Sequence, residues 1–244
     1  MGTIDDIRRY WDEDAATYDD ARQHRPTEPA VMAAWTAAVE AALPPPPTAV
    51  LDCGAGTGFL SLIAARLGHQ VTALDVSPEM LGRLRARAAA EGLHVHTVVG
   101  LAAEPPGRDF GAIIERHLLW TLPDPAGALS SWREAAPAGR LVLVESIWGA
   151  VDPIEALRSA AGRILGRLHR MPPEHHAEYS DELRRSLPLG HGTHPGTLVS
   201  LAVDAGWRTP RLHRLRDVEW AERMALPLAE RLVGTAPRFL VVAD

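Results

Sequence analysis

The sequence predicts an α/β fold in which a doubly wound, mostly parallel sheet of seven strands carries helices on both faces. Three observations predict it. Apolar runs alternate with segments of helical periodicity between residues 49 and 147, which is typical of a parallel sheet. A glycine-rich turn follows the first predicted strand, and a carboxylate ends the second. With 244 residues, 46% of them hydrophobic, the chain can form one large domain with a small lid.

Residues 1–43 form a predicted N-terminal helical cap. Its first helix places apolar side chains on one face at helical spacing, and 29–43 form a second, alanine-rich helix. The apolar face of the first helix comprises Ile4, Ile7, Trp11, Ala15 and Tyr18. The prolines at 44–47 cannot continue a helix, so they act as a stiff spacer before the next unit.

The core is predicted over 44–150, the lid over 151–194 and the completion of the sheet over 195–244. In the core, strands are expected near 49–52, 70–75, 94–99, 110–115 and 140–147, with helices near 58–68, 78–91 and 125–136. From 151 the alternation stops and a helical stripe continues, which indicates an inserted helical lid. Helices at 195–205 and 220–233 and strands at 207–215 and 239–242 then close the sheet.

The turn after the first strand has the composition of a cofactor cradle. Gly54, Gly56 and Gly58 let the backbone approach a ligand, and the helix that follows directs free N–H groups toward it. Asp75 ends the second strand about 20 residues later, where an acid binds ribose hydroxyls. An adenosyl cofactor is therefore predicted. A nicotinamide cofactor is one alternative, but Phe59 stands where its third glycine is needed.

Several segments resemble the class I S-adenosylmethionine-dependent methyltransferases, in particular their UbiE-like small-molecule branch. Val50 to Gly58 is similar to motif I of this family, and Asp75 matches its ribose acid. The segments 116–125 and 132–141 resemble the stretch after the fourth strand and the next helix, turn and strand. Residues 10–19 resemble the N-terminal cap of these enzymes.

The resemblance implies a Rossmann-like sheet that ends on an antiparallel strand, with S-adenosylmethionine as cofactor and S-adenosylhomocysteine as product. The implied cofactor-binding residues are Tyr18, Asp52, Gly54, Ala55, Gly56, Gly58, Asp75, Val76, Met80, Leu101, Ala102 and Glu115. Tyr18 either closes over the methionine end of the cofactor or staples the cap to the core. Leu101 is a departure, because relatives carry an acid there that holds the adenine amino group. Backbone groups at 101–102, or Glu104, are the replacements expected.

Candidate catalytic residues follow the fourth and fifth strands, because ligands of open α/β sheets bind at the carboxyl ends of strands. They are Glu115, His117 and Glu145. His117 has an ordinary pKa of about 6.5, which suits a base at neutral pH, although a structural role is the favoured interpretation. Glu115 can orient an amine acceptor or take a proton, with a salt bridge to a neighbouring arginine such as Arg116 as the alternative. Glu145 is expected to face the acceptor, and residues 115–117 are expected to border the methyl-transfer centre.

Composition excludes several function classes. The chain contains no lysine, which removes Schiff-base chemistry and Walker-type phosphate binding. It contains no asparagine, which argues against the metal-dependent catechol type of methyltransferase. No metal is expected, since His191 and His194 lie in a stretch rich in glycine and proline with poor ligand geometry. The net charge of −6 predicts no nucleic-acid or membrane partner.

The predicted function is methyl transfer from S-adenosylmethionine to an oxygen or nitrogen of a small molecule. A protein or peptide acceptor and a non-catalytic cofactor-binding protein stay open as alternatives. The single cysteine and the absence of a signal-peptide pattern favour the cytoplasm, and a monomer or homodimer is expected. The use of arginine in place of lysine suggests a GC-rich bacterial genome and secondary metabolism.

Overall fold

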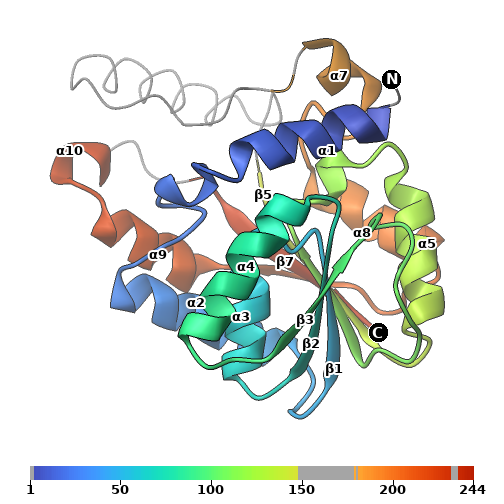
Figure 1. The fold of residues 1–244 in the computed structure, drawn as a ribbon, viewed down its shortest axis with the longest axis horizontal. Coiled ribbons are helices and arrows are strands. Elements are labelled where there is room, and N and C mark those ends of the chain that lie inside the picture. The colour runs from blue at the N-terminus through green and yellow to red at the C-terminus, as the bar shows by residue number, and fades with distance from the viewer. Residues whose placement is uncertain (1–2, 148–178, 180, 232–235) are drawn as a thin grey trace.

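A computed structural model describes residues 3–147, 179, 181–231 and 236–244. Its centre is a seven-stranded sheet of order β3-β2-β1-β4-β5-β7-β6 (Figure 1). The strands are β1 (Ala49–Cys53), β2 (Gln70–Asp75), β3 (Val95–Val99), β4 (Ala112–Arg116), β5 (Arg140–Ser146), β6 (Arg211–Arg214) and β7 (Arg238–Ala243). The first five are parallel, and β7 runs antiparallel to both β5 and β6. The predicted fold class is confirmed.

Helices cover both faces of the sheet. One face carries α2 (Pro29–Ala42), α3 (Phe59–Arg66), α4 (Pro78–Ala90) and α9 (Arg216–Ala225), and the other carries α5 (Pro125–Ala135) and α8 (Pro195–Asp204) (Figure 1). The helix α1 (Thr3–Asp14) crosses the carboxyl ends of the strands. Shorter elements are η1 (Tyr18–Asp20), η2 (Leu119–Thr121), α7 (Asp181–Ser186) and α10 (Leu228–Arg231).

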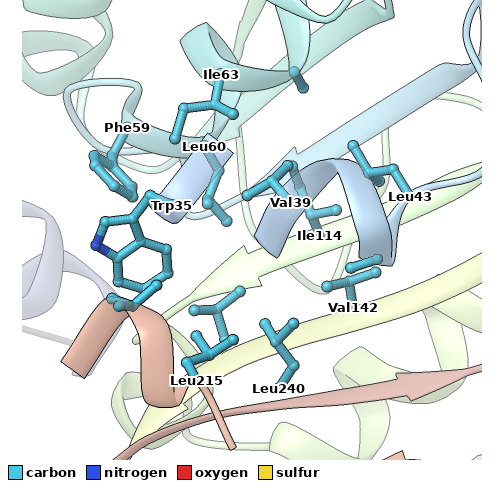
Figure 2. Packing of buried hydrophobic residues seen from close by; sticks show 14 of the residues in the cluster. Trp35, Val39, Leu43, Phe59, Leu60, Ile63, Ile114, Val142, Leu215 and Leu240 are labelled. Atoms are coloured by element: carbon cyan, nitrogen blue, oxygen red, sulfur yellow. The ribbon is translucent and has the colours of Figure 1, made fainter. Parts of the chain in front are cut away.

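Alternating side chains on the central strands explain the two cores. Ile114 of β4 and Val142 of β5 point toward α2 and α3, where Trp35 and Phe59 meet edge to face at 5.3 Å (Figure 2). Ile113 and the other strand residues whose side chains point to the opposite face of the sheet pack against α5 and α8. Because both faces are buried, the central strands read as continuous apolar runs in the sequence.

The structure corrects some of the expected boundaries. The last strand pair was expected to include 207–215, but β6 has four residues, all exposed, at the edge of the sheet. The helix expected over 220–233 divides into α9 and α10, and Pro227 lies between them. The segment 148–178, which holds most of the predicted lid, lies outside the described residues. No helix in the described part of the chain is long and apolar enough to cross a membrane.

Candidate functional site

The glycine turn between β1 and α3 adopts the backbone conformation that glycine permits. Gly54, Gly56 and Gly58 have φ values of 64°, 54° and 91°, which side chains rarely adopt. A Cβ on Gly58 would lie 2.0 Å from Cδ1 of Leu84, so this glycine lets α3 and α4 pack closely. A Cβ on Gly56 would meet nothing within 4 Å, so the backbone there faces open space.

Asp75 connects this turn to the end of β2. Its Oδ2 accepts the backbone N–H of Gly56 at 2.8 Å, and its Oδ1 accepts that of Ser77 at 2.8 Å. Ser77 in turn caps α4, because its Oγ accepts the N–H of Met80 at 3.1 Å. Burial raises the pKa of Asp75 to about 6, against the opposing effect of the two backbone bonds. Each carboxylate oxygen keeps acceptor capacity for a ligand.

Asp52 lies on β1, directly before the turn. It is buried in β1, and its Oδ2 accepts the hydroxyl of Ser61 on α3 at 2.6 Å. Burial raises the pKa of Asp52 to about 7, and the hydrogen bond from Ser61 opposes that shift. The carboxyl group therefore loses its proton near neutral pH.

The turn, Asp75 and the loop after β3 surround one cavity of about 230 Å³. Much of its wall is apolar and includes Leu74, Val76 and Met80 as well as residues 101–103 of the loop after β3. Trp132 of α5 fixes that loop, because its Nε1 donates to the carbonyl of Ala102 at 2.7 Å. A smaller cavity adjoins the first and is lined by Tyr18, Asp52, Gly54, Ala55, Gly56, Thr57, Phe59, Leu60 and Arg116.

The N-terminal segment covers the larger cavity. Ile4, Ile7 and Trp11 of α1 line it, and Tyr18 of η1 lines both cavities. Two carboxylates connect this segment to the turns that follow β1 and β2. Asp12 accepts the Ser77 hydroxyl at 2.5 Å, and Asp19 accepts that of Thr57 at 2.7 Å. The cap is therefore tied directly to the glycine turn and to the start of α4.

At the ends of β4 and β5, the buried Glu115 and Glu145 and the partly exposed His117 form a polar group. Nδ1 of His117 lies 3.1 Å from Oε2 of Glu145, and its Nε2 lies 3.5 Å from Nη1 of Arg238. A guanidinium has only donors, so Nε2 is the acceptor and Nδ1 donates to Glu145. Burial and the positive charges of Arg116 and Arg238 hold the pKa of His117 well below its ordinary value.

The two glutamates lie behind the cavity wall. Both side chains are fully buried, and neither lines a cavity described above. Oε2 of Glu115 accepts the N–H of Leu118 at 2.9 Å, which holds the backbone beside His117, whose φ is 58°. Burial raises the pKa of Glu115 to about 8, and burial together with the Glu115 charge raises that of Glu145 well above its ordinary value.

The structure brings most of the predicted cofactor residues to the two cavities. Tyr18, Asp52, Gly54, Ala55, Gly56, Asp75, Val76, Met80, Leu101 and Ala102 all line one or both. Gly58 and Glu115 do not, and Glu104 is exposed outside the lining. Of the catalytic candidates, His117 lines the larger cavity. His194 caps α8, and its Nδ1 accepts the N–H of Gly196 at 3.1 Å.

Several lining residues were not predicted from the sequence. Ile4, Ile7 and Trp11 share a helical face whose packing partner the periodicity does not identify. Thr121 to Asp124, in the loop that leads to α5, also line the larger cavity. Arg116, by contrast, was expected at the site together with Glu115 and His117, because it ends the fourth strand, and it lines both cavities.

Residues 50–139 match the family model of a methyltransferase domain. Ubiquinone biosynthesis O-methyltransferase of Xanthomonas axonopodis pv. citri is 38% identical over 110 residues, which is 43% of this chain and 46% of that protein. The orthologue from Xanthomonas euvesicatoria is also 38% identical, over 38% of this chain and 41% of that protein. The chain therefore spans less than half the length of the curated relatives it matches.

Two solved structures share the fold over nearly the whole chain. A geranyl diphosphate methyltransferase, solved with sinefungin, has a TM-score of 0.63 at 15% identity and covers 100% of this chain and 99% of its own. Magnesium protoporphyrin IX methyltransferase from Synechocystis PCC 6803 has a TM-score of 0.61 at 16% identity, covering 98% and 99%. At these identities the likeness establishes the fold alone.

Proposed function

We propose, from the premise that residues 50–139 are a methyltransferase domain of the class I S-adenosylmethionine-dependent type, that this protein methylates an oxygen or nitrogen of a small molecule. The proposal rests on one observation, that three segments of the chain converge on the same cavity. The glycine turn, the carboxylate of Asp75 and the 101–103 backbone reach it from three different strand ends. These are the parts that an adenosyl ligand needs.

The residues present fit such a ligand. Asp75 offers two carboxylate oxygens already oriented by backbone N–H groups, which suits the paired hydroxyls of a ribose. Gly56 leaves room for a ligand above the turn. The apolar lining from Val76, Met80 and Leu101 suits an adenine, and backbone groups would supply hydrogen bonds in place of the missing acid. Asp52 offers a carboxylate to an ammonium group.

When bound, S-adenosylmethionine supplies an electrophilic methyl group on a sulfonium, with a good leaving group. The protein then has to orient the acceptor and exclude water. In this proposal Trp11 and Tyr18 exclude water from the cavity, because the N-terminal segment to which they belong covers it. We assign His117 a positioning role, since both ring nitrogens are directed at Glu145 and Arg238. The acceptor therefore supplies its own nucleophilic form.

The acceptor is proposed to be a small molecule methylated on oxygen, as the relatives' names favour that atom. Nitrogen stays the alternative. We also propose that the protein acts in the cytoplasm of a bacterium as a monomer or homodimer. The net charge of −6 supports the absence of a nucleic-acid or membrane partner. The use of arginine in place of lysine supports a bacterial source with a GC-rich genome and a role in secondary metabolism.

Isothermal titration with S-adenosylhomocysteine and with NAD⁺ tests the cofactor. The proposal expects binding of the first and none of the second. Asp75→Asn should weaken S-adenosylhomocysteine binding about 10- to 100-fold, because hydrogen bonds to a charged group are lost. Asp204→Asn, an exposed carboxylate on α8, is the matched control. Unchanged affinity in Asp75→Asn would remove the ribose assignment, and NAD⁺ binding alone would overturn the proposed function.

A further inference from the structure

Arg116 is a cation that both cavities share. It ends β4, and it lines the larger cavity beside His117 and the smaller one beside Asp52. Among the described residues that line the two cavities, it is the only arginine. The sequence prediction gave its side chain one role only, as the partner in the alternative salt bridge of Glu115.

Aromatic rings hold the guanidinium in place. Its central carbon lies 4.1 Å from the ring centroid of Phe59 and 5.2 Å from that of Trp35. One terminal nitrogen, Nη2, donates to the carbonyl of Gln23, while Nε is buried without a hydrogen-bond partner in the described part of the chain. The side chain is thus fixed on one edge and retains a donor for something else.

No described carboxylate forms an ion pair with Arg116. The ion pairs of the described residues include Arg238 with Glu222 at 2.7 Å, but none with Arg116. Burial and the nearby charge of Arg238 lower the pKa of Arg116 to about 10. Arg116 is partly exposed, but its Nε is buried and has no hydrogen-bond partner in the described part of the chain, so an anionic ligand group would be stabilised here.

The surroundings indicate which anion. The smaller cavity holds the carboxyl of Asp52 as well as Arg116, and its wall includes the first residues of α3, Phe59 and Leu60. A carboxyl group faces an ammonium, and an arginine with a helix N-terminus faces a carboxylate. One ligand end that carries both charges on the same carbon is an α-amino acid.

We propose that Arg116 binds the carboxylate of the amino-acid end of the adenosyl cofactor. The inference rests on the proposed function and adds to it a specific anchor for this end of the ligand. Arg116 touches the ligand in this account, whereas Trp35 and Phe59 position it. An anionic acceptor on the same guanidinium is the competing assignment, and the test below separates the two.

The experiment compares two ligands that differ only at this end. S-adenosylhomocysteine carries the amino acid, while 5′-methylthioadenosine keeps the adenosine and the sulfur and lacks the amino acid. Titration calorimetry on the wild type and on Arg116→Met should show S-adenosylhomocysteine weakened about 10- to 100-fold, as expected for a lost charge-assisted bond. Binding of 5′-methylthioadenosine should change less than about 3-fold. Arg116→Lys should recover part of the loss, because it keeps the charge without the planar fork.

Arg133→Met is the matched control. Arg133 also stacks on a tryptophan, 4.9 Å from the Trp207 centroid, and donates to the carbonyl of Pro137 at 2.8 Å, but it lines neither cavity. It should leave both affinities unchanged. If Arg116→Met does not fold, Arg116→Lys carries the same comparison.

Three outcomes overturn the inference. Equal weakening of both ligands would mean that Arg116 acts through packing alone. If folded Arg116→Met binds S-adenosylhomocysteine as tightly as the wild type does, the guanidinium would be assigned to an anionic acceptor instead. A wild-type protein that binds neither ligand would refute the proposed function and this inference together, whereas the first two outcomes leave the proposed function standing.

Discussion

Asp52 is expected to destabilise the ligand-free protein at neutral and basic pH. The side chain is 2% exposed, and burial raises its pKa to about 7 from 3.8. Asp52→Asn removes the ionisable group while keeping its size, and the amide oxygen can still accept the hydroxyl of Ser61. The substitution should therefore stabilise the ligand-free protein where the carboxyl would be ionised.

The size of the effect follows from the two pKa values. The folded protein holds the proton more tightly than the unfolded chain, so the stabilisation from this group is complete below pH 3.8 and is lost as pH rises through about 7. At about 1.4 kcal/mol per pKa unit, the whole loss is about 4 kcal/mol. Between pH 6 and pH 8 the loss is about 1.4 kcal/mol, because the carboxyl titrates within that interval.

Urea unfolding at pH 6 and pH 8 measures this directly. The difference in free energy of unfolding between Asp52→Asn and wild type should be about 1.4 kcal/mol more favourable to the variant at pH 8 than at pH 6. Asp204→Asn serves as the control for an exposed carboxylate. An Asp52→Asn difference that is the same at both pH values, or that is less favourable at pH 8, would refute the reasoning.

Two further substitutions test the packing of the site. Gly58→Ala puts a Cβ 2.0 Å from Cδ1 of Leu84 at φ 91° and should cost about 2–4 kcal/mol in thermal unfolding, whereas Gly92→Ala, at φ 65° with open space, should cost about 1 kcal/mol. Equal losses of stability in the two variants would show that the contact between the new Cβ and Leu84 adds nothing to the cost of the positive φ. Trp132→Phe removes the 2.7 Å bond to Ala102 and should weaken S-adenosylhomocysteine about 3- to 10-fold by calorimetry; unchanged affinity would contradict that role.

Local spacing was enough to predict the centre of the site. Gly54, Gly56 and Asp75 lie at fixed distances along one strand–turn–helix–strand unit, so their proximity follows from the chain itself. The match of 50–139 to a methyltransferase domain agrees with that prediction. The parallel part of the sheet was likewise predictable from the alternation of strands and helices over 49–147, and the antiparallel β7 from the family resemblance.

The parts that depend on long-range packing were not predictable. Whether Trp11 covers a cavity depends on where α1 lies against the strand ends, and helical periodicity contains no such information. Glu115 and Glu145 lie near the ends of adjacent strands, as expected. Their positions behind His117 depend on contacts that the sequence does not indicate: Glu115 accepts the N–H of Leu118, and His117 contacts Glu145 and Arg238 of β7. Those partners come from distant segments or from a turn whose geometry the sequence leaves open.

The central claim is that this protein moves a methyl group from S-adenosylmethionine to a small molecule. Incubation with S-adenosylmethionine bearing a trideuterated methyl, together with a metabolite extract of a GC-rich bacterium, tests it by mass spectrometry. A small molecule should gain the labelled methyl only when the protein is present. Label found only on a polypeptide, or no label anywhere despite measured cofactor binding and acceptor-rich extracts, would contradict it.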